Sequence, residues 1–228
     1  MSGLPTPYYD KDGIVIYNSD CREILPHVMA DAWFADPPYG VNLEARNTKW
    51  SRREGSYTQV EDTPEYVRAV VVPVIESLIA SGKPGAVTPG TRNLWLYPPA
   101  LEMGAVWSPA GAGMCSWGFQ TSHPILYYNK CPYLARGLGS RPTGTVENNA
   151  TEENGHPCPK PPKLMKWFVS RLTLEGQTIL DPFCGSGTTL FAAKELGRRA
   201  IGIEIEEKYC EIAVQRLAQN VFDFAGAA

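Results

Sequence analysis

The sequence lacks any pair of cysteines at the C-x-x-C spacing of zinc and redox sites, although it contains 6 cysteines. Its 3 histidines are scattered, and together with the cysteines they form no recognisable zinc pattern. We therefore expect free thiols in a reducing compartment and no metal ion. A signal peptide and a long apolar run are also missing, which predicts an intracellular, cytoplasmic protein without a membrane partner.

A positive net charge is missing as well. The 21 lysines and arginines are outnumbered by 24 acidic residues, so the formal net charge is -3. The molecule as a whole therefore does not attract nucleic acid, and any surface for nucleic acid must be a local patch. The 228 residues, 43% of them hydrophobic, are enough for a sizeable core. We expect a single domain over residues 1–228, with rigid loops supplied by its 20 prolines.

A glycine-rich turn at residues 181–189, with the sequence DPFCGSGTT, organises the rest of the chain. It follows the apolar run 178–180 and opens a predicted helix at 188–196. A strand, a glycine turn and a helix start together form a site for a nucleotide-like ligand, because the backbone approaches the ligand closely and offers free N–H groups. The turn has no Walker lysine, and Leu190 replaces the third glycine of the NAD fingerprint. A mononucleoside therefore fits better, with Phe183 as a stacking or apolar surface.

A second apolar run, residues 200–203, ends at Glu204. An acid at the end of the second strand of such a unit is placed to accept hydrogen bonds from ribose hydroxyls. The order strand, glycine turn, helix, strand, acid is more specific than any one of its parts. For the turn alone, an ordinary tight connection between a strand and a helix remains the alternative.

The predicted strand at residues 32–35 stops at Asp36-Pro37-Pro38-Tyr39. Two prolines end a strand abruptly because neither can donate to the ladder. The alternation of predicted strands and helices favours an α/β protein, with a mostly parallel twisted sheet and helices on both faces. Ligands of such sheets bind beyond the carboxyl ends of the strands. Both special turns follow strands, so we expect them to face each other at the same edge.

Apolar periodicity predicts further elements. Strands are expected at residues 14–17, 85–88, 105–107 and 125–128. Helices are expected at residues 21–28, 63–79, 94–103, 163–172 and 206–219. Pro73 predicts a kink in the second helix, and Pro98-Pro99 a break in the third. Residues 1–13 are expected to be a loose arm, and the Gly-, Pro- and Asn-rich residues 131–160 a long loop with little core of their own.

Two segments carry basic residues that suit contact with nucleic acid. Residues 41–62 interleave four basic side chains with aromatic ones, a combination that suits phosphate contact with base stacking. A second basic group stands at the start of the 131–160 loop. A solvated polar loop is the alternative for residues 41–62. The candidate DNA-binding residues are Arg46, Lys49, Trp50, Arg52, Arg53, Lys130, Arg136 and Arg141.

The tetrapeptide at residues 36–39, combined with Phe183-x-Gly185-x-Gly187, resembles the amino-methylating DNA methyltransferases, which use S-adenosylmethionine. Since the tetrapeptide precedes the glycine turn, the order resembles the β class, whose sequence is permuted relative to the common Rossmann-like methyltransferase fold. The segment 18–21 resembles the part of this family that reaches the cofactor adenine, and 156–161 the part near its methionine. The resemblance implies cofactor binding by Asp20, Cys21, His156, Lys160, Asp181, Phe183, Cys184, Gly185, Ser186, Gly187, Thr188 and Glu204.

The chemistry of the tetrapeptide follows from the substrate. An exocyclic amine of a base is a poor nucleophile, because its lone pair is delocalised into the ring. The Asp36 carboxylate and the Pro37 carbonyl can each accept one N–H and so localise that lone pair, and Pro37 and Pro38 keep both acceptors rigid. Tyr39 is expected to stack on the base, which must be flipped out of the duplex. The methyl group then moves in line, without a metal or a covalent intermediate.

Asp36 at the first position implies adenine N6 as the target, whereas Ser in this family goes mostly with cytosine N4. Sequence-specific members carry a substantial recognition region where this chain has only residues 131–155. We therefore expect short or relaxed sequence specificity, or help from a homodimer or partner subunit, as would suit a phage or mobile element. The alternatives are a cytosine-N4 enzyme, an RNA or small-molecule methyltransferase, and a catalytically silent nucleic-acid-binding protein.

Overall fold

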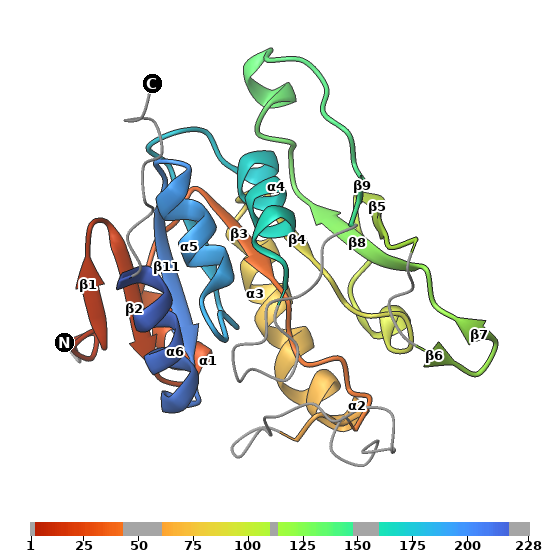
Figure 1. The fold of residues 1–228 in the computed structure, drawn as a ribbon, viewed down its shortest axis with the longest axis horizontal. Coiled ribbons are helices and arrows are strands. Elements are labelled where there is room, and N and C mark those ends of the chain that lie inside the picture. The colour runs from red at the N-terminus through yellow and green to blue at the C-terminus, as the bar shows by residue number, and fades with distance from the viewer. Residues whose placement is uncertain (1–2, 43–60, 110–113, 148–159, 219–228) are drawn as a thin grey trace, which may run out of the picture.

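The computed structural model describes residues 3–42, 61–109, 114–147 and 160–218. Its main element is a sheet of nine strands with helices on both faces (Figure 1). Across the sheet the order is β1-β2-β11-β10-β3-β4-β8-β5-β9. Their bounds are β1 Tyr9–Lys11, β2 Ile14–Asn18, β3 Ala32–Ala35, β4 Gly85–Val87, β5 Glu102–Trp107, β8 Ser122–Tyr128, β9 Thr145–Val146, β10 Thr178–Asp181 and β11 Arg199–Glu204. A separate hairpin, β6 (Met114–Cys115) and β7 (Gly118–Phe119), lies between β5 and β8 in the chain.

The helices connect these strands and cover the two faces of the sheet. Their bounds are α1 Cys21–Ile24, α2 Pro64–Tyr66, α3 Val72–Ala80, α4 Pro162–Leu172, α5 Thr188–Glu195 and α6 Glu207–Ala218. Short turns of other helical types are η1 Leu25–His27, η3 Val67–Val71, η4 Leu94–Leu96 and η5 Leu134–Arg136. Within the residues that the structure describes, no helix combines the length and the apolar character that crossing a membrane requires.

The strands β2, β11, β10, β3 and β4 run parallel, and β8 runs antiparallel to both β4 and β5. All four residues of β3 are buried, as is typical of a parallel strand that is covered on both faces. The predicted α/β fold, with a mostly parallel sheet and helices on both faces, is confirmed.

Strand β3 shows how the two hydrophobic cores arise. Successive side chains of a strand point to opposite faces. Phe34 packs on Phe168 of α4 with ring centroids 4.4 Å apart, while Trp33 stacks on Tyr128 in the other core at 5.8 Å. Helices α4, α5 and α6 contribute to the core on the Phe34 face, and α1 and α3 to the core on the Trp33 face. Figure 1 shows α4, α5 and α6 on the near face of the sheet and α3 behind it.

The position of the crevice follows from this arrangement. Strands β10 and β3 are neighbours, but β10 leads into α5 on one face and β3 leads towards α3 on the other. Where adjacent parallel strands send their connections to opposite faces, a crevice opens beyond their carboxyl ends. The turns that follow β3 and β10 therefore meet at this crevice.

The helix predicted to begin at Thr63 does so, since the Thr63 hydroxyl accepts a hydrogen bond from the Tyr66 N–H at 3.1 Å and Pro64 takes the first helical position. Pro73 was predicted to kink this helix. The structure has a π-helical turn, η3, which ends at Val71, two residues before Pro73. Proline has no N–H to give to the preceding turn, and a widened turn is one of the ways a helix accommodates that loss.

Two sequence-based expectations about segments were wrong. Residues 1–13 are not all a loose arm, because β1 pairs with β2 from Tyr9 opposite Ile16. The helix expected at 94–103 is reduced to η4, since the two prolines favour extended backbone and Glu102 already belongs to β5. In the described part of the 131–160 loop, Tyr133 is buried and its hydroxyl donates to the Ser170 carbonyl of α4 at 2.5 Å, which anchors the loop on that helix.

Candidate active site

A cleft at the carboxyl ends of β3 and β10 joins the two special turns. We call residues Asp36–Tyr39 the tetrapeptide turn and Asp181–Gly187 the glycine turn. The predicted meeting of these turns at one edge is confirmed. The residues that line the cleft come from six segments of the chain. They are Ser19, Asp20, Cys21, Asp36, Pro37, Pro38, Tyr39, Tyr66, Lys160, Met165, Asp181, Pro182, Phe183, Cys184, Gly185, Ser186, Thr188, Thr189, Ile203, Glu204 and Ile205.

The Asp36 carboxylate accepts hydrogen bonds from three side chains in the cleft. Its Oδ1 accepts hydrogen bonds from the Tyr39 hydroxyl at 2.7 Å and the Thr88 hydroxyl at 2.5 Å. Its Oδ2 accepts from the Lys160 ammonium at 2.5 Å, and Lys160 also donates to the Tyr39 oxygen at 3.1 Å. Burial acts to raise the pKa of Asp36, but the charge of Lys160 and these three hydrogen bonds outweigh it and lower the pKa. The carboxylate is therefore ionised at neutral pH.

An ionised carboxylate has about four acceptor positions, and these three donors use all but about one of them. Asp36 can thus accept one further N–H without losing a partner. Tyr39 is held as a neutral phenol, because burial and then the nearby Asp36 charge raise its pKa. The Lys160 ammonium also lies 5.2 Å from the centroid of the Tyr39 ring.

The tetrapeptide turn is fixed from behind by residues that the sequence did not single out. The Asn93 amide donates to the carbonyls of Tyr39 at 2.7 Å and Gly40 at 3.1 Å, and the Gly40 N–H donates to the Asp62 carboxylate at 2.6 Å. Gly90 has a φ of +68°, and a Cβ there would meet the Tyr39 ring at 2.9 Å. Only a glycine lets this segment approach the ring so closely. The turn is therefore held rigidly on the side away from the cleft.

The glycine turn is tied to the end of β11 by Glu204. The Glu204 carboxylate accepts from the Gly185 N–H at 2.9 Å and from the Glu206 N–H at 2.8 Å. Gly185 and Gly187 both have positive φ, at 51° and 74°, where side chains are disfavoured. A Cβ at Gly187 would also lie 2.6 Å from the Ala213 side chain of α6. Glu204, predicted to contact a ribose, thus also shapes the turn itself.

Two acids of the cleft are poised between charged and neutral forms. Burial raises the pKa of Asp181 to about 7, and the charges of Asp36 and Glu204 add to the effect. Burial likewise raises the pKa of Glu204 to about 7, with a further contribution from Glu206. Carboxylates that have lost hydration and repel one another are stabilised by a ligand that brings positive charge or hydroxyl donors. The cleft is therefore suited to a cationic or hydroxyl-rich ligand.

The far end of the cleft is built by the start of α1. The Asp20 carboxylate caps this helix by accepting from the Arg22 N–H at 2.9 Å, and it pairs with the Arg22 guanidinium at 2.5 Å. Burial raises the pKa of the Cys21 thiol to about 12, so it is neutral. The rings of Tyr66 and Phe183 line the same cleft and offer apolar surface for a flat heterocycle.

The structure brings most of the predicted site residues together, with some differences. Gly187 does not line the cleft but supports the turn below it. Lys160, expected at the cofactor, lines the cleft and also contacts Asp36 and Tyr39. His156 lies outside the described residues, as do Arg46, Lys49, Trp50, Arg52 and Arg53.

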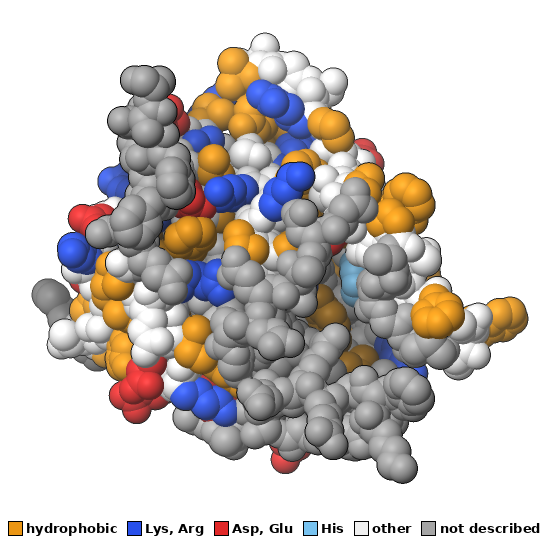
Figure 2. Space-filling model, in the orientation of Figure 1, with side chains coloured by type: hydrophobic (Ala, Val, Ile, Leu, Met, Phe, Trp, Pro, Cys, Tyr) orange, Lys and Arg blue, Asp and Glu red, His pale blue; other side chains and the backbone are white. Residues whose placement is uncertain are grey.

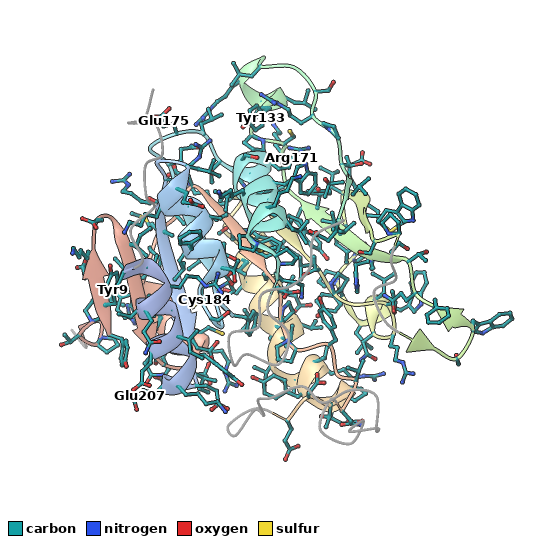
Figure 3. All side chains as sticks on the ribbon, in the orientation of Figure 1. Tyr9, Tyr133, Arg171, Glu175, Cys184 and Glu207 are labelled. Atoms are coloured by element: carbon teal, nitrogen blue, oxygen red, sulfur yellow. The ribbon has the colours of Figure 1, made fainter. Side chains whose placement is uncertain are left out.

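The other three basic candidates lie at the opposite edge of the sheet. Strand β8 is antiparallel to β4, so its last residue, Tyr128, stands opposite Gly85 at the start of β4. Lys130 and Arg136 follow β8 and line a hollow at that amino-terminal edge. Arg141 lies over the Tyr133 ring at 4.6 Å, and Figure 3 places Tyr133 far from Cys184 of the glycine turn. These residues therefore lie at the opposite edge of the sheet from the tetrapeptide turn, and their contact with DNA stays a prediction.

Comparison with known proteins agrees with this geometry. A family model described as DNA methylase matches residues 91–215, more than half of the chain. The type II methyltransferase M2.DpnII of Streptococcus pneumoniae is 29% identical over 95% of this chain and 94% of its own length. The type II methyltransferase M.ScaI of Streptomyces caespitosus is 26% identical over 96% and 87%.

Solved structures show the same fold. The complex of M1.HpyAVI with SAM, at 21% identity, superposes with a TM-score of 0.61 and covers 90% of this chain and all of its own. The PvuII DNA methyltransferase, described as cytosine-N4-specific, has 16% identity and a TM-score of 0.64, over 95% of this chain and 90% of its own.

The cleft fits S-adenosylmethionine on its own chemistry. The ligand carries a sulfonium and an ammonium group, which suit the Asp181 carboxylate, and ribose hydroxyls, which suit Glu204. Its adenine base suits the apolar rings of Tyr66 and Phe183. When bound, this group supplies a methyl on a positively charged sulfur. By sequence and by fold, the chain belongs to the DNA methylase family of N6- and N4-amino methyltransferases, which use S-adenosylmethionine as cofactor.

Proposed function

We propose that this DNA methyltransferase acts on the exocyclic N6 amine of adenine in duplex DNA, with a short or relaxed recognition sequence. The observation that carries the proposal is the ionised Asp36 carboxylate, held rigidly at the mouth of a cleft whose other wall is the glycine turn. An aspartate at this position favours adenine over cytosine. Cytosine N4 is the second candidate, because one protein of this fold is described as cytosine-N4-specific.

In this proposal the tetrapeptide turn orients the amine. Asp36 accepts one N–H through its remaining acceptor position, and the Pro37 carbonyl accepts the other. Both acceptors stand in fixed positions before the reaction, so little reorganisation opposes it. This arrangement would localise the lone pair of the nitrogen, and the bound cofactor would supply the methyl group. Tyr39 lies against the base and keeps its ring plane fixed.

Lys160 sets the protonation state of Asp36 in this scheme. Because its ammonium lowers the pKa of Asp36, the carboxylate acts as a hydrogen-bond acceptor before transfer. After transfer the nitrogen carries a positive charge and is a strong acid, so even this weak base can take its proton. Lys160 is a positioning residue for the amine acceptor, and its place in the lining of the cleft leaves it available to the cofactor as well.

The cofactor roles remain proposals of the same kind. Asp20 and Glu204 would accept hydrogen bonds from the ribose and adenine end, while Phe183 and Tyr66 would cover the adenine ring. Asp181, Cys184, Ser186 and Thr188, which also line the cleft, would contact the methionine part. His156 is proposed to approach the methionine part from the segment ahead of Lys160.

The proposal extends to how DNA is engaged. The target base is flipped into the cleft, since its amine is inaccessible in a duplex. The basic residues 46–53 contact phosphates, and recognition beyond a few bases is supplied by a second copy or a partner subunit where it is needed. One methyltransferase domain spans the chain, and it modifies DNA in the cytoplasm of a prokaryotic host or on behalf of a phage.

The test compares methyl acceptors. Purified protein is incubated with labelled S-adenosylmethionine and with duplex DNA, single-stranded DNA or RNA, and the digested nucleosides are separated by mass spectrometry. We expect N6-methyladenine from duplex DNA. N4-methylcytosine as the main product would replace adenine by cytosine as the target, and methylation of RNA alone would reject the proposed substrate.

A further inference from the structure

The β6–β7 hairpin is the most conspicuous feature that this function leaves unexplained. Its strands pair from Met114 opposite Phe119, and the residues Ser116 and Trp117 form its tip. Trp117 is 98% exposed and Phe119 is 79% exposed. In the part of the chain that the structure describes, neither strand pairs with the nine-stranded sheet. An isolated two-stranded hairpin is only marginally stable in water. Two exposed aromatic side chains on such a hairpin therefore suggest that it binds a partner.

The hairpin projects from the edge of the sheet where the tetrapeptide turn lies. It connects the end of β5 to the start of β8, and Trp107 stands opposite Ser122 at that point. Since β8 is antiparallel to β4, its start lies at the carboxyl end of β4, next to the end of β3. Figure 1 shows β6 and β7 extending beyond the body of the molecule, and Figure 2 shows hydrophobic side chains at this projection.

A chain of contacts joins the hairpin to Tyr39. The Gln120 side chain, directly after β7, accepts from the Thr91 hydroxyl at 3.3 Å and donates to the Ser122 carbonyl at 3.0 Å. Thr91 follows Gly90, which packs against the Tyr39 ring. The base of the hairpin is therefore held by the same segment that supports the tetrapeptide turn.

The charge pattern of this region suits DNA. The sequence between Glu102 and Glu147 contains no acidic residue, although the chain as a whole carries a net charge of -3. Nothing on the hairpin would repel phosphates, and Arg92, next to Thr91, is exposed for a phosphate contact. The hairpin itself has no basic residue, so its own contribution is apolar.

We propose that the β6–β7 hairpin is a wedge that enters the DNA beside the target base, with Trp117 stacking on the bases exposed when the target leaves the helix. This inference rests on the proposed methylation of a flipped base. Apolar side chains that insert between base steps unstack them, and an aromatic ring can stack on any base. A second copy of the chain is the less suitable occupant, because a stable interface buries roughly 800 Å² on each partner, which a tip of six residues does not supply by itself.

The experiment compares Trp117→Ala with Trp117→Phe on three DNA acceptors of one sequence: a paired duplex, a duplex with a mismatch opposite the target, and a single strand. Trp117→Ala should lower the methylation rate on the paired duplex by roughly 10-fold or more. It should lower the rate less than about threefold on the mismatched duplex and on the single strand, where the target base is already unpaired. Trp117→Phe should retain most of the activity on all three. Met29→Ala, an 89% exposed side chain ahead of β3, is the matched control and should change nothing.

A second readout does not depend on methyl transfer. With 2-aminopurine at the target position, the wild-type protein should raise its fluorescence, and Trp117→Ala should reduce that rise. Equal rates for Trp117→Ala and wild type on paired duplex would overturn the wedge, and so would an equal loss on all three acceptors. A dimer that becomes monomeric on Trp117→Ala would assign the hairpin to a second copy instead. If the wild type methylates no DNA yet shows a Trp117-dependent rise, the proposed function fails and the wedge stands.

Discussion

Replacing Lys160 by methionine removes the charge that sets the state of Asp36 while keeping the length of the side chain. In the wild-type protein the pKa of Asp36 is lowered even though burial opposes ionisation. Without the ammonium the burial remains and the pKa rises. In the wild type the methylation rate should fall only at a pH below the ordinary pKa of an aspartate. In Lys160→Met this fall in rate should occur at a higher pH.

The effect on stability has a definite sign. In the wild type the pKa of Asp36 is lower in the folded state than its unfolded value near 3.8. The ionised carboxylate therefore stabilises the folded protein at pH values above 3.8, and this stabilisation is lost as the pH falls through the folded-state pKa. In Lys160→Met the folded-state pKa of Asp36 is raised above its unfolded value. The neutral carboxyl group then stabilises the folded protein at acid pH, and this stabilisation is lost as the pH rises through the folded-state pKa. Breaking a buried ion pair costs roughly 3–5 kcal/mol. For Lys160→Met we expect a loss of about 3 kcal/mol in the free energy of unfolding at pH 7, the lower end of this range. The side chains of Lys160 and Asp36 are 23% and 18% exposed, so solvent partly screens their interaction.

Thermal unfolding at pH 5 and pH 7, with methylation rates over the same range, measures both effects. The difference in stability between wild type and Lys160→Met should shrink at the lower pH. The matched control is Lys166→Met, which breaks a 2.6 Å pair with Glu195, whose side chain is 16% exposed. It should also cost stability, because it leaves a largely buried carboxylate without this partner, but it should leave the rate profile unchanged. An unshifted rate profile in Lys160→Met, with a stability loss independent of pH, would refute the assignment of Lys160.

Three further predictions concern the two turns and the choice of sequence. Asp36→Ala should abolish methylation but leave S-adenosylmethionine affinity within a few-fold, and near-normal turnover would contradict its role. Gly185→Val, at a φ of 51°, and Phe183→Ala should mainly weaken the cofactor, which calorimetry measures; unchanged affinity in both would be the contrary result. Arg52→Ala combined with Arg53→Ala should lower activity on all sequences alike and flatten its salt dependence. Sequencing after exhaustive reaction should show a preference of about one to three bases, and a single fixed site of four or more would exclude relaxed recognition.

The sequence was sufficient for the parallel sheet and for the meeting of the two turns. Buried strands such as Ala32–Ala35 are short apolar runs, and each of the two turns is a contiguous motif that follows a strand. The carboxyl ends of neighbouring parallel strands share an edge, so local patterns fix the position of both turns.

The supporting residues could not be found in the same way. Thr88 and Lys160 meet Asp36 across 52 and 124 positions of the chain, and no periodicity or motif encodes that contact. Lys160 was named from its own segment, though for the cofactor, whereas Thr88, the last residue of a predicted strand, was not singled out. The pairing of β1 with β2 was missed for a related reason, since its three residues are too few to show an alternating pattern.

The pairing of β2 with β11 has a consequence for the synthesis of the enzyme. The Asn18 amide of β2 donates to the Glu204 carbonyl of β11 across 186 positions, so two strands that border the cofactor cleft lie far apart in the sequence. Contacts of such long range form slowly, and during translation they must wait until the later strand has left the ribosome. A nascent chain that already exposes Asp36 but not Glu204 therefore lacks one wall of the cleft for the methyl donor.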